Sequence, residues 1–357
     1  MSTFLSGVGV ILSLELRQRV RGTAWYVLLG IFVALVAIVT FLLQVALGGY
    51  GQNDGGLAGN GIFSSIIYFV LLLGTLVAPA LSGNAINGDR DAGTLATTQV
   101  TLISTWQIVI GKFFAAWITA LAFLACAVPF LIYASFVGDL SASTILVSVL
   151  ILAVELGVVA AIGVGLSGIL SKPLFSIVAT YLVVAALSIG TLIAFSLGGL
   201  AVQSTVTSSF SSGIRYDDDK GVPLECGAPV VSTSQVPRFD YFWGILVANP
   251  YVLLADAVPT ELGPEGYPVD LFGSIKVGVR TVQIPPDLNT IYNECEDAAS
   301  GFTSQLGPTP REILNSTVPA WFVGFAIHLV LAAGALVGAW ARTRTPAGRL
   351  AKGTRIA

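Results

Sequence analysis

Long apolar runs separated by polar stretches are the main pattern in this sequence. Six runs reach the roughly 20 residues that a helix needs to cross the ~30 Å hydrocarbon core of a bilayer. They lie at residues 25–48, 62–82, 108–136, 144–170, 174–199 and 320–341. Backbone groups in lipid must be hydrogen-bonded within their own segment, so each run is expected to form a helix. The pattern predicts an all-α integral membrane protein with six transmembrane helices.

Polar segments flank the first and last runs. Residues 1–24 precede the first run, and within them residues 8–21 combine a loosely apolar face with three arginines near the span. This combination predicts a helix lying in the membrane interface, with a basic anchor of undefined structure as the alternative. Residues 342–357 form a basic tail after the last run.

Two further polar segments interrupt the apolar runs. Residues 86–107 separate the second run from the third within the transmembrane unit 25–199. Residues 200–319 separate the fifth run from the sixth and predict a large insertion outside the bundle. Within this insertion, residues 241–258 are too rich in aromatic and aliphatic side chains for disorder. We expect them to form a short helix or two against the membrane surface, beside a loop-rich remainder.

Composition excludes a soluble globular protein. Hydrophobic residues make up 55% of the chain and charged residues 10%, against about 25% charged residues in a typical soluble domain. The mean hydropathy is +0.84. So little charge cannot cover a surface that faces water, and the predicted surroundings are a lipid bilayer with no nucleic-acid partner.

The distribution of charge predicts the orientation in the membrane. With six spans both termini lie on one side, together with the 86–107 segment. Counting Lys112 at the membrane edge, this side carries eleven Lys and Arg against three Asp and Glu, and the opposite loops carry six against sixteen. Basic residues near span ends stay in the cytoplasm. We therefore expect a plasma-membrane protein with both termini cytoplasmic and residues 200–319 extracytoplasmic.

Cysteine positions agree with this orientation. Cys126 lies in the third run, where it is expected to be a small apolar filler. Cys226 and Cys295 are the only cysteines of the 200–319 insertion, on the side where disulfides persist. A disulfide between them would close a loop of about 70 residues and stabilise the fold by roughly 4 kcal/mol. Two unpaired thiols are the alternative, since spacing alone gives no geometry.

The sequence contains no recognisable catalytic machinery. No phosphate-binding motif G-x-x-x-x-G-K-[ST] occurs, because Gly111-Lys112 is followed by Phe113. The single histidine, His328, cannot build a metal site alone and is expected to pack within the last run. We predict that the chain is not an enzyme and binds no cofactor or metal. Glu155 lies within a run, where it either faces a transport pathway or hydrogen-bonds a neighbouring helix.

The 86–107 segment has a succession of charged, glycine and apolar residues that is unusual for a loop between spans. Its notable residues are Asp89, Arg90, Asp91, Gly93, Thr94, Leu95, Leu102, Ile103 and Trp106, followed by Gly111 and Lys112 at the membrane edge. A simple connecting loop, which is the alternative, has no reason to hold Leu95, Leu102 and Ile103 near water. Trp106 suits the membrane edge, and Lys112 can extend its ammonium group back to that edge. The pattern favours a short helix on which a partner can act.

The stretch GDRDAGTLATTQVTLISTWQIVIGKFFAAW resembles the segment between the second and third spans of type 2 ABC-transporter permeases. In that family a charged cluster is followed by Gly-Thr-Leu, a short coupling helix and an aromatic-led third span that carries Gly-Lys. Asp89-Arg90-Asp91, Gly93-Thr94-Leu95 and Gly111-Lys112 match these positions, and Thr101-Leu102-Ile103 stands where the family usually has proline. ANPYVLLADAVP at 248–259 also resembles the family's outer motif after the fifth span.

The resemblance implies a six-helix permease of a bacterial ABC exporter. Such a permease pairs with a second permease chain, identical or related, and docks two separate cytoplasmic ABC ATPase subunits that bind ATP and Mg²⁺. The expected contact uses the charges of Asp89, Arg90 and Asp91, while Leu95, Leu102 or Ile103 fills a groove on the ATPase. Two alternatives stay open: a non-transporting component of an envelope complex that acts through residues 200–319, and an ion-coupled carrier that uses Glu155.

Overall fold

The computed structural model describes residues 2–48, 57–95, 103–138, 140–216, 223–294 and 307–344. Within these ranges, six helices are long and apolar enough to cross a membrane, as predicted. The chain is mostly helical and has the make-up of a multi-pass membrane protein. The spans are α2 (Thr23–Gly48), α3 (Leu57–Ser82), α6 (Thr105–Gly138), α7 (Ala142–Ile169), the unit of α8 (Pro173–Ala185), η1 (Ala186–Gly190) and α9 (Thr191–Ala201), and α15 (Trp321–Thr343).

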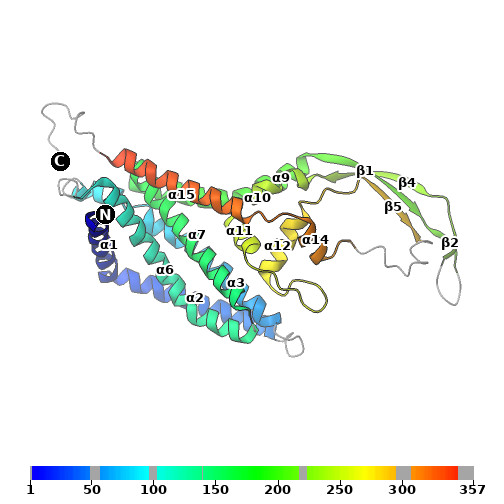
Figure 1. The fold of residues 1–357 in the computed structure, drawn as a ribbon, viewed down its shortest axis with the longest axis horizontal. Coiled ribbons are helices and arrows are strands. Elements are labelled where there is room, and N and C mark those ends of the chain that lie inside the picture. The colour runs from blue at the N-terminus through cyan, green and yellow to red at the C-terminus, as the bar shows by residue number, and fades with distance from the viewer. Residues whose placement is uncertain are drawn as a thin grey trace.

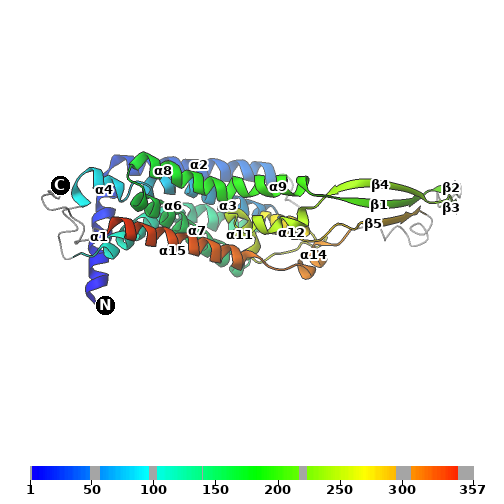
Figure 2. The same cartoon turned by 90° about the horizontal axis from the view of Figure 1, so that it is seen from above.

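The helix expected before the first span is present as α1 (Ser2–Arg21). In both Figure 1 and Figure 2, α1 runs across one end of the bundle, whereas the spans run along the long axis of the molecule. The short helix α4 (Asn87–Asp91) lies at the same end (Figure 2), which we call the α1 end. The opposite end carries an extended β-sheet (Figure 2) and is called the sheet end.

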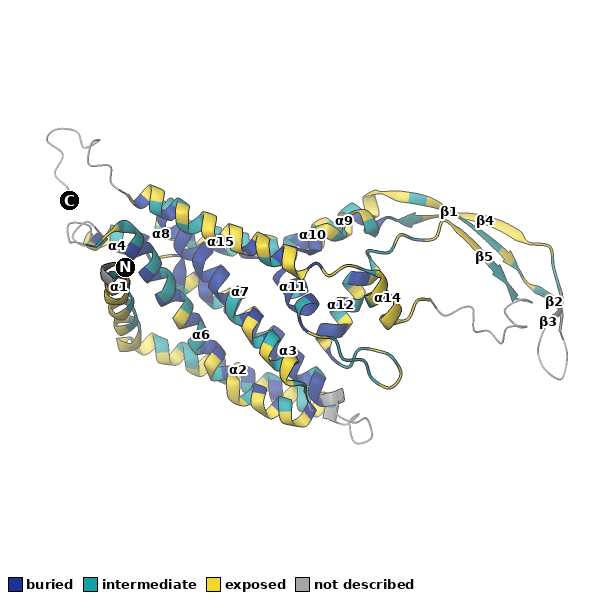
Figure 3. Cartoon of the chain, viewed as in Figure 1, coloured by how far each residue is buried: buried dark blue, intermediate teal, exposed yellow. Residues whose placement is uncertain are grey.

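The centre of the bundle is formed by α3 and α7. In the most apolar stretch of each, 61% of the residues are buried, against 17% in the first, fifth and sixth spans. The main core joins these two helices to α6 and α2 through large side chains such as Phe63, Leu71 and Leu152. Apolar side chains on α2, α9 and α15 are exposed instead (Figure 3). This distribution suits helices whose outer faces meet lipid.

Close contact between α7 and α15 depends on small residues. A Cβ built on Gly165 would lie 2.4 Å from Cβ of Ala335, and one on Gly168 would lie 2.5 Å from Cβ of Ala339. These distances are too short for any side chain, so glycine is required at both positions. Without a strong hydrophobic force between helices in lipid, such close backbone contact is a main source of helix association.

The fifth span changes its hydrogen-bond pattern at η1, which is a single π-helical turn. The carbonyl of Ser188 in this turn accepts a hydrogen bond from Asn249 Nδ2 at 2.6 Å. The same Asn249 caps the next helix through its Oδ1, which accepts from the backbone N–H groups of Tyr251 and Val252. π-Turns often mark functional positions. Here the turn supplies a carbonyl that ties the fifth span to the chain that follows it.

Residues 241–258 form the two short helices that the sequence predicts, α10 (Trp243–Leu246) and α11 (Pro250–Ala257). They lie deeper than expected. Leu253 and Leu254 of α11 are 1% and 0% exposed and belong to the same core as α3 and α7. The described part of this end also contains a 3-10 turn and two helices: η2 (Phe239–Tyr241), α12 (Leu271–Thr281) and α14 (Pro310–Ser316).

The prediction of an all-α chain is wrong between the fifth and sixth spans. A three-stranded sheet of order β4-β1-β5 is built from β1 (Gln203–Ser211), β4 (Val230–Pro237) and β5 (Asn289–Asn293), and a two-stranded sheet from β2 (Gly213–Tyr216) and β3 (Pro223–Cys226). β1 is antiparallel to β4, from Gln203↔Pro237 to Phe210↔Val230, and parallel to β5. Threonine and valine are frequent in β1 and β4 and favour strands. The sheet projects away from the bundle (Figures 1 and 2).

Candidate functional site

The described residues of the predicted ATPase contact lie at the α1 end, where α4 meets α6 and the end of α7 (Figure 2). The 86–107 segment does not form one helix in its described part. Helix α4 covers Asn87–Asp91, and Trp106 already lies in the first turn of α6. Leu102 lies outside the described residues. The site is therefore a short turn-rich connection held between longer helices.

The sequence led us to expect that Lys112 extends toward the membrane edge, but its side chain turns inward. Its side chain is 3% exposed and pairs with Glu15 of α1 and with Asp89 of α4, the latter at 2.7 Å from Nζ to Oδ2. Helix α1 covers it because Gly111 allows a close approach: a Cβ there would lie 2.7 Å from Cβ of Ile11. A buried ammonium group needs paired charges, and these two carboxylates supply them.

Arg90 also turns inward. Its guanidinium donates to Oδ1 of Asn87 at 2.9 Å and to the carbonyls of Leu170 at 3.1 Å and Gly168 at 3.4 Å. These carbonyls belong to the last turn of α7, which has no following helical N–H groups to satisfy them and attracts positive charge. The charges of Asp89 and Arg90 are thus used inside the chain and fasten α4 to α6 and α7.

Three polar residues that sequence reasoning missed complete this attachment. The backbone N–H groups of Ile86 and Asn87 donate to Oγ of Ser167 on α7 at 2.9 and 3.0 Å. Asn87 Nδ2 donates to Oγ of Ser176 on α8 at 3.1 Å. Asn87, Ser167 and Ser176 are all 0% exposed. Small polar residues inside apolar runs were the available signal, but their partners depend on the tertiary fold.

The apolar residues of the segment support it from within. Leu95 is 7% exposed and packs with Ile86 and Ile108 in a core at the α1 end, and Ile103 packs against the same cluster. This corrects the expectation that Leu95 is presented to a partner. Trp106 stacks on Trp340 of α15, with ring centroids 5.2 Å apart.

The exposed part of α4 and the following turn comprises Asp91, Ala92, Gly93 and Thr94. Asp91 makes no ion pair with any residue in the described ranges. Gly93 has a φ of +72°, a left-handed conformation that glycine adopts without strain. Thr94 Oγ1 donates to the carbonyl of Asp89 at 3.2 Å. The result is a small protruding turn on a fixed base.

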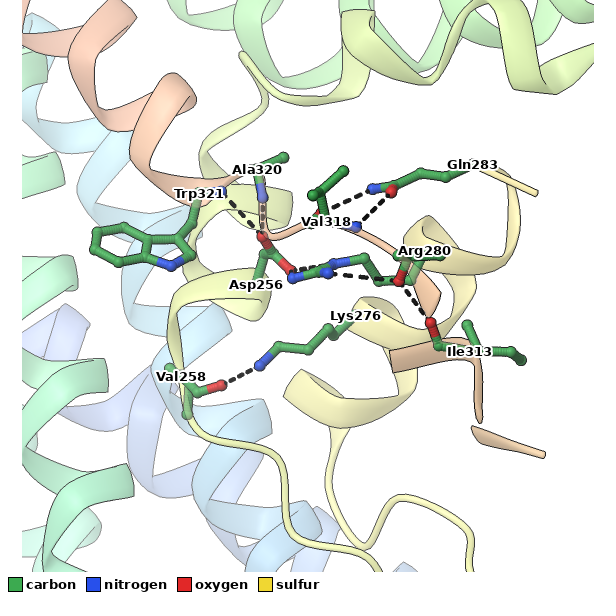
Figure 4. A network of polar contacts seen from close by, with 10 residues as sticks. Asp256, Val258, Lys276, Arg280, Gln283, Ile313, Val318, Ala320 and Trp321 are labelled. Atoms are coloured by element: carbon green, nitrogen blue, oxygen red, sulfur yellow. Dashed lines mark hydrogen bonds and ion pairs between the residues drawn. The ribbon is translucent and has the colours of Figure 1, made fainter. Parts of the chain in front are cut away.

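A second polar cluster joins the elements at the sheet end (Figure 4). Asp256 of α11 accepts from Arg280 of α12 through Oδ1, at 2.8 Å from Nε and 2.7 Å from the terminal nitrogen Nη2. Its Oδ2 accepts from the backbone N–H groups of Ala320 and Trp321 at 2.7 and 2.9 Å. The first turn of α15 has unpaired N–H groups, and its N-cap residue provides no side-chain acceptor. Asp256 supplies that acceptor from another helix.

Nearby, Lys276 on α12 donates to the carbonyl of Val258 at 2.6 Å, and burial lowers the pKa of its ammonium group. Asp270 caps the start of the same helix by accepting from the N–H of Gly273 at 2.7 Å. Burial raises the pKa of the Asp270 carboxyl to about 6. Buried ionisable groups thus fix the start of α12 through Asp270, its middle through Lys276 and its end through Arg280.

Glu155 lies in the middle of α7 and faces α15. His328 Nδ1 is 2.8 and 3.0 Å from the two carboxylate oxygens of Glu155, and both side chains are almost completely buried. Of the two expectations for Glu155, the structure shows the hydrogen bond to a neighbouring helix. No local pattern indicates that its partner is the single histidine, which lies 173 residues away.

Cys126 is a free thiol in α6. Cys226 ends β3 and is not a free thiol. Cys295 lies outside the described residues, so its disulfide with Cys226 stays a prediction.

Comparison with known proteins adds no assignment. No protein-family model matches the chain, and no curated protein is significantly similar to it.

We predict that Asp89→Asn destabilises the protein and that Asp91→Asn, its matched control two residues away, does not. Asp89→Asn removes one of the two charges that neutralise buried Lys112. Breaking a buried pair costs about 3–5 kcal/mol, and Asp89 is partly exposed, so we expect roughly 1–3 kcal/mol. Thermal unfolding of the detergent-solubilised protein measures the difference. Equal unfolding temperatures for the two variants would show that the Lys112 pairs contribute nothing.

We also predict a pH dependence from Asp270. A carboxyl pKa of about 6 in the folded chain, against about 3.9 when unfolded, means that the folded state binds the proton more tightly. The free energy of unfolding is then greatest below about pH 4 and falls as pH rises through about 6. Asp270→Asn keeps a good N-cap and removes this slope, so it should stabilise the protein by up to about 3 kcal/mol at pH 8. Thermal unfolding at pH 5 and pH 8 tests this, with exposed Glu265→Gln as control. A slope that survives in Asp270→Asn contradicts the assignment.

Proposed function

We propose that this chain is the permease subunit of an ATP-driven ABC exporter in the plasma membrane. In this proposal the α1 end is cytoplasmic and the sheet end is extracytoplasmic. ATP and Mg²⁺ are bound by a separate ABC ATPase, and a second permease chain, identical or related, completes the transporter. The chain itself performs no chemistry.

The observation that carries the proposal is the attachment of the 86–95 turn to the spans. A partner can move the helices of a membrane protein through a protruding element only if that element is firmly attached to them. Asp89 is paired with Lys112 of the third span, and Arg90 bonds the end of the fourth. Asn87 bonds the start of the fifth through Ser176. Force applied to this turn therefore reaches three spans and, through Glu15, helix α1.

The contact surface that we assign differs from the one expected from the motif alone. Asp89, Arg90 and Leu95 hold the turn in place, and the exposed turn of Asp91, Gly93 and Thr94 provides the contact. Asp91 is the charge available to a basic residue of the ATPase. A rim pair of this kind stabilises a complex by about 0–1 kcal/mol, so affinity must also come from shape and from neighbouring surface.

Movement at the α1 end has a defined path to the sheet end. The fifth span is hydrogen-bonded to Asn249 at the start of α11. The start of the sixth span is hydrogen-bonded to Asp256 near the end of α11. Helix α11 is therefore fixed to two spans at once. In the proposed cycle, ATP binding tilts the spans and displaces α11 and α12 together, which opens the outer side. The proposed Cys226–Cys295 disulfide lies on that side.

We predict that Asp91→Arg lowers the ATP hydrolysis that accompanies the purified chain. The chain is purified from its native membrane in mild detergent, and hydrolysis per permease is measured. Reversing one rim charge should reduce ATPase retention by about fivefold, because attraction becomes repulsion. Glu265→Arg is the matched control, since Glu265 is also exposed but lies at the sheet end. Absence of hydrolysis from the wild-type preparation, or an equal loss in both variants, contradicts the proposal.

The projecting sheet favours a second candidate, an envelope component that acts by binding a partner outside. Strands β1 to β4 can be removed without stretching the chain, because the N–H of Arg238 donates to the carbonyl of Val202 at 2.9 Å. We predict that replacing residues 203–237 with a short Gly-Ser linker leaves ATPase association unchanged in the exporter. Loss of cellular function in this variant, combined with full function in Asp91→Arg, would favour the second candidate instead.

A further inference from the structure

The pair of Glu155 and His328 is the most deeply buried acid–base pair in the described part of the chain. Their side chains are 2% and 1% exposed and come from α7 and α15. The other ring nitrogen of His328, Nε2, lies 2.9 Å from the carbonyl oxygen of Ala248, in the link between α10 and α11. One imidazole therefore connects the fourth span, the sixth span and the inserted helices of the sheet end.

The chemistry of these contacts fixes the number of hydrogens. A carbonyl oxygen can only accept, so Nε2 must carry a hydrogen and donate it to Ala248. Nδ1 then faces the carboxylate with room for one hydrogen between them. With none, a nitrogen lone pair faces an unpaired buried anion, and with two, an imidazolium faces a neutral acid. Both leave one uncompensated charge in an apolar site, which is strongly unfavourable. A single hydrogen gives a neutral pair, whichever atom holds it.

We propose that Glu155 and His328 form a proton-binding site that holds one proton between them, and that this occupancy locks the α10–α11 link to α15. Loss of the proton, or gain of a second, disturbs the pair and weakens the hydrogen bond to Ala248. Ala248 precedes Asn249, which caps α11 and bonds the π-turn of the fifth span. Proton occupancy would therefore control how firmly the sheet end is attached to three spans.

The surroundings allow no other group to neutralise this site. A cavity of about 10 Å³ beside the pair is lined mainly by apolar residues, among them Leu71, Val158 and Pro250. That volume is near the lower limit for one water molecule. Thr75 and Val184 separate this cavity from an apolar groove of about 410 Å³ on the outside of α3 and α8.

Several titratable groups on the neighbouring described elements have partners inside the chain. Tyr68 on α3 donates to the carbonyl of Tyr251, and Tyr181 on α8 donates to that of Leu76. Lys112 of α6 pairs with Glu15 and Asp89, and Asp256 of α11 pairs with Arg280. Asp256 contacts Trp321, seven residues from His328 and so about 10 Å along α15. The ionisable residues on helices beside the Glu155–His328 pair thus include Tyr68, Lys112, Tyr181, Tyr251 and Asp256.

This inference does not rest on the proposed exporter function. It concerns the protonation of one contact and the attachment of one link, and both can be measured without ATP, an ATPase or a substrate. A failure of the ATPase experiment would leave it intact. It also differs from ion-coupled transport by Glu155, because the proton serves to hold the structure and need not cross the membrane.

The single histidine makes a direct test possible. The protein is labelled with ¹⁵N-histidine, purified through a tag without histidine and placed in lipid nanodiscs, so that only His328 contributes a signal. From about pH 6 to about pH 8, where a free histidine titrates, we expect Nε2 to stay protonated and Nδ1 to keep its hydrogen bond to Glu155. In Glu155→Gln the Nδ1 signal should change to that of an unprotonated acceptor. An unprotonated Nε2, free titration in this range, or an unchanged Nδ1 signal in Glu155→Gln overturns the proposal.

Hydrogen exchange tests the locking function. The experiment compares about pH 6–8 with lower or higher pH values at which the histidine signals show that the one-proton state is lost. At those pH values, the backbone amides at 247–257 should exchange about tenfold faster after correction for the intrinsic pH dependence of exchange. A change of about tenfold is expected for loss of one buried hydrogen bond. Glu155→Gln/His328→Gln is the matched control, because two amide side chains can hydrogen-bond each other and Ala248 but do not titrate. We expect no pH-dependent change in that variant. An equal acceleration in both proteins shows that the pair does not control the link.

Discussion

The need to pair every buried polar group inside the chain governs this structure. In an apolar bundle neither water nor lipid can compensate a charge or an unpaired donor. In the described part of the chain, three clusters pair buried charges: Glu15–Asp89–Lys112 at the α1 end, Glu155–His328 in the middle, and Asp256–Arg280 at the sheet end. Each cluster joins different helices. These charge pairs therefore add specific attachments to helices that also associate through close apolar packing.

The sequence predicts the spans well because their signal is local. A run of about 20 apolar residues has few alternatives to a membrane-crossing helix, and the six helices appear where expected. The strands β1 and β4 were missed because serine- and threonine-rich stretches were assigned to loops, although their β-branched residues favour strands. Their pairing joins residues 203 and 237, a separation that no local pattern reports.

The position of Asp89, Arg90 and Leu95 between two spans could be predicted from the sequence, because the spans on either side are clear. Which of these side chains turn inward depends on Lys112, Leu170 and Ile108, which only the folded bundle brings near. A charged residue next to a membrane is easily read as exposed, because the carbonyls or opposite charges that attract it are invisible in one dimension. The same reason explains why Glu155 was noticed but its pairing with His328 was not.

The covering of Lys112 by α1 has a consequence for how the protein is made. Helix α1 precedes the third span in the chain, so its Glu15 is synthesised about 97 residues before the lysine that it neutralises. Glu15 is therefore already present when the third span is made. Pairing with it removes the cost of leaving the Lys112 ammonium group as a lone charge in an apolar bundle.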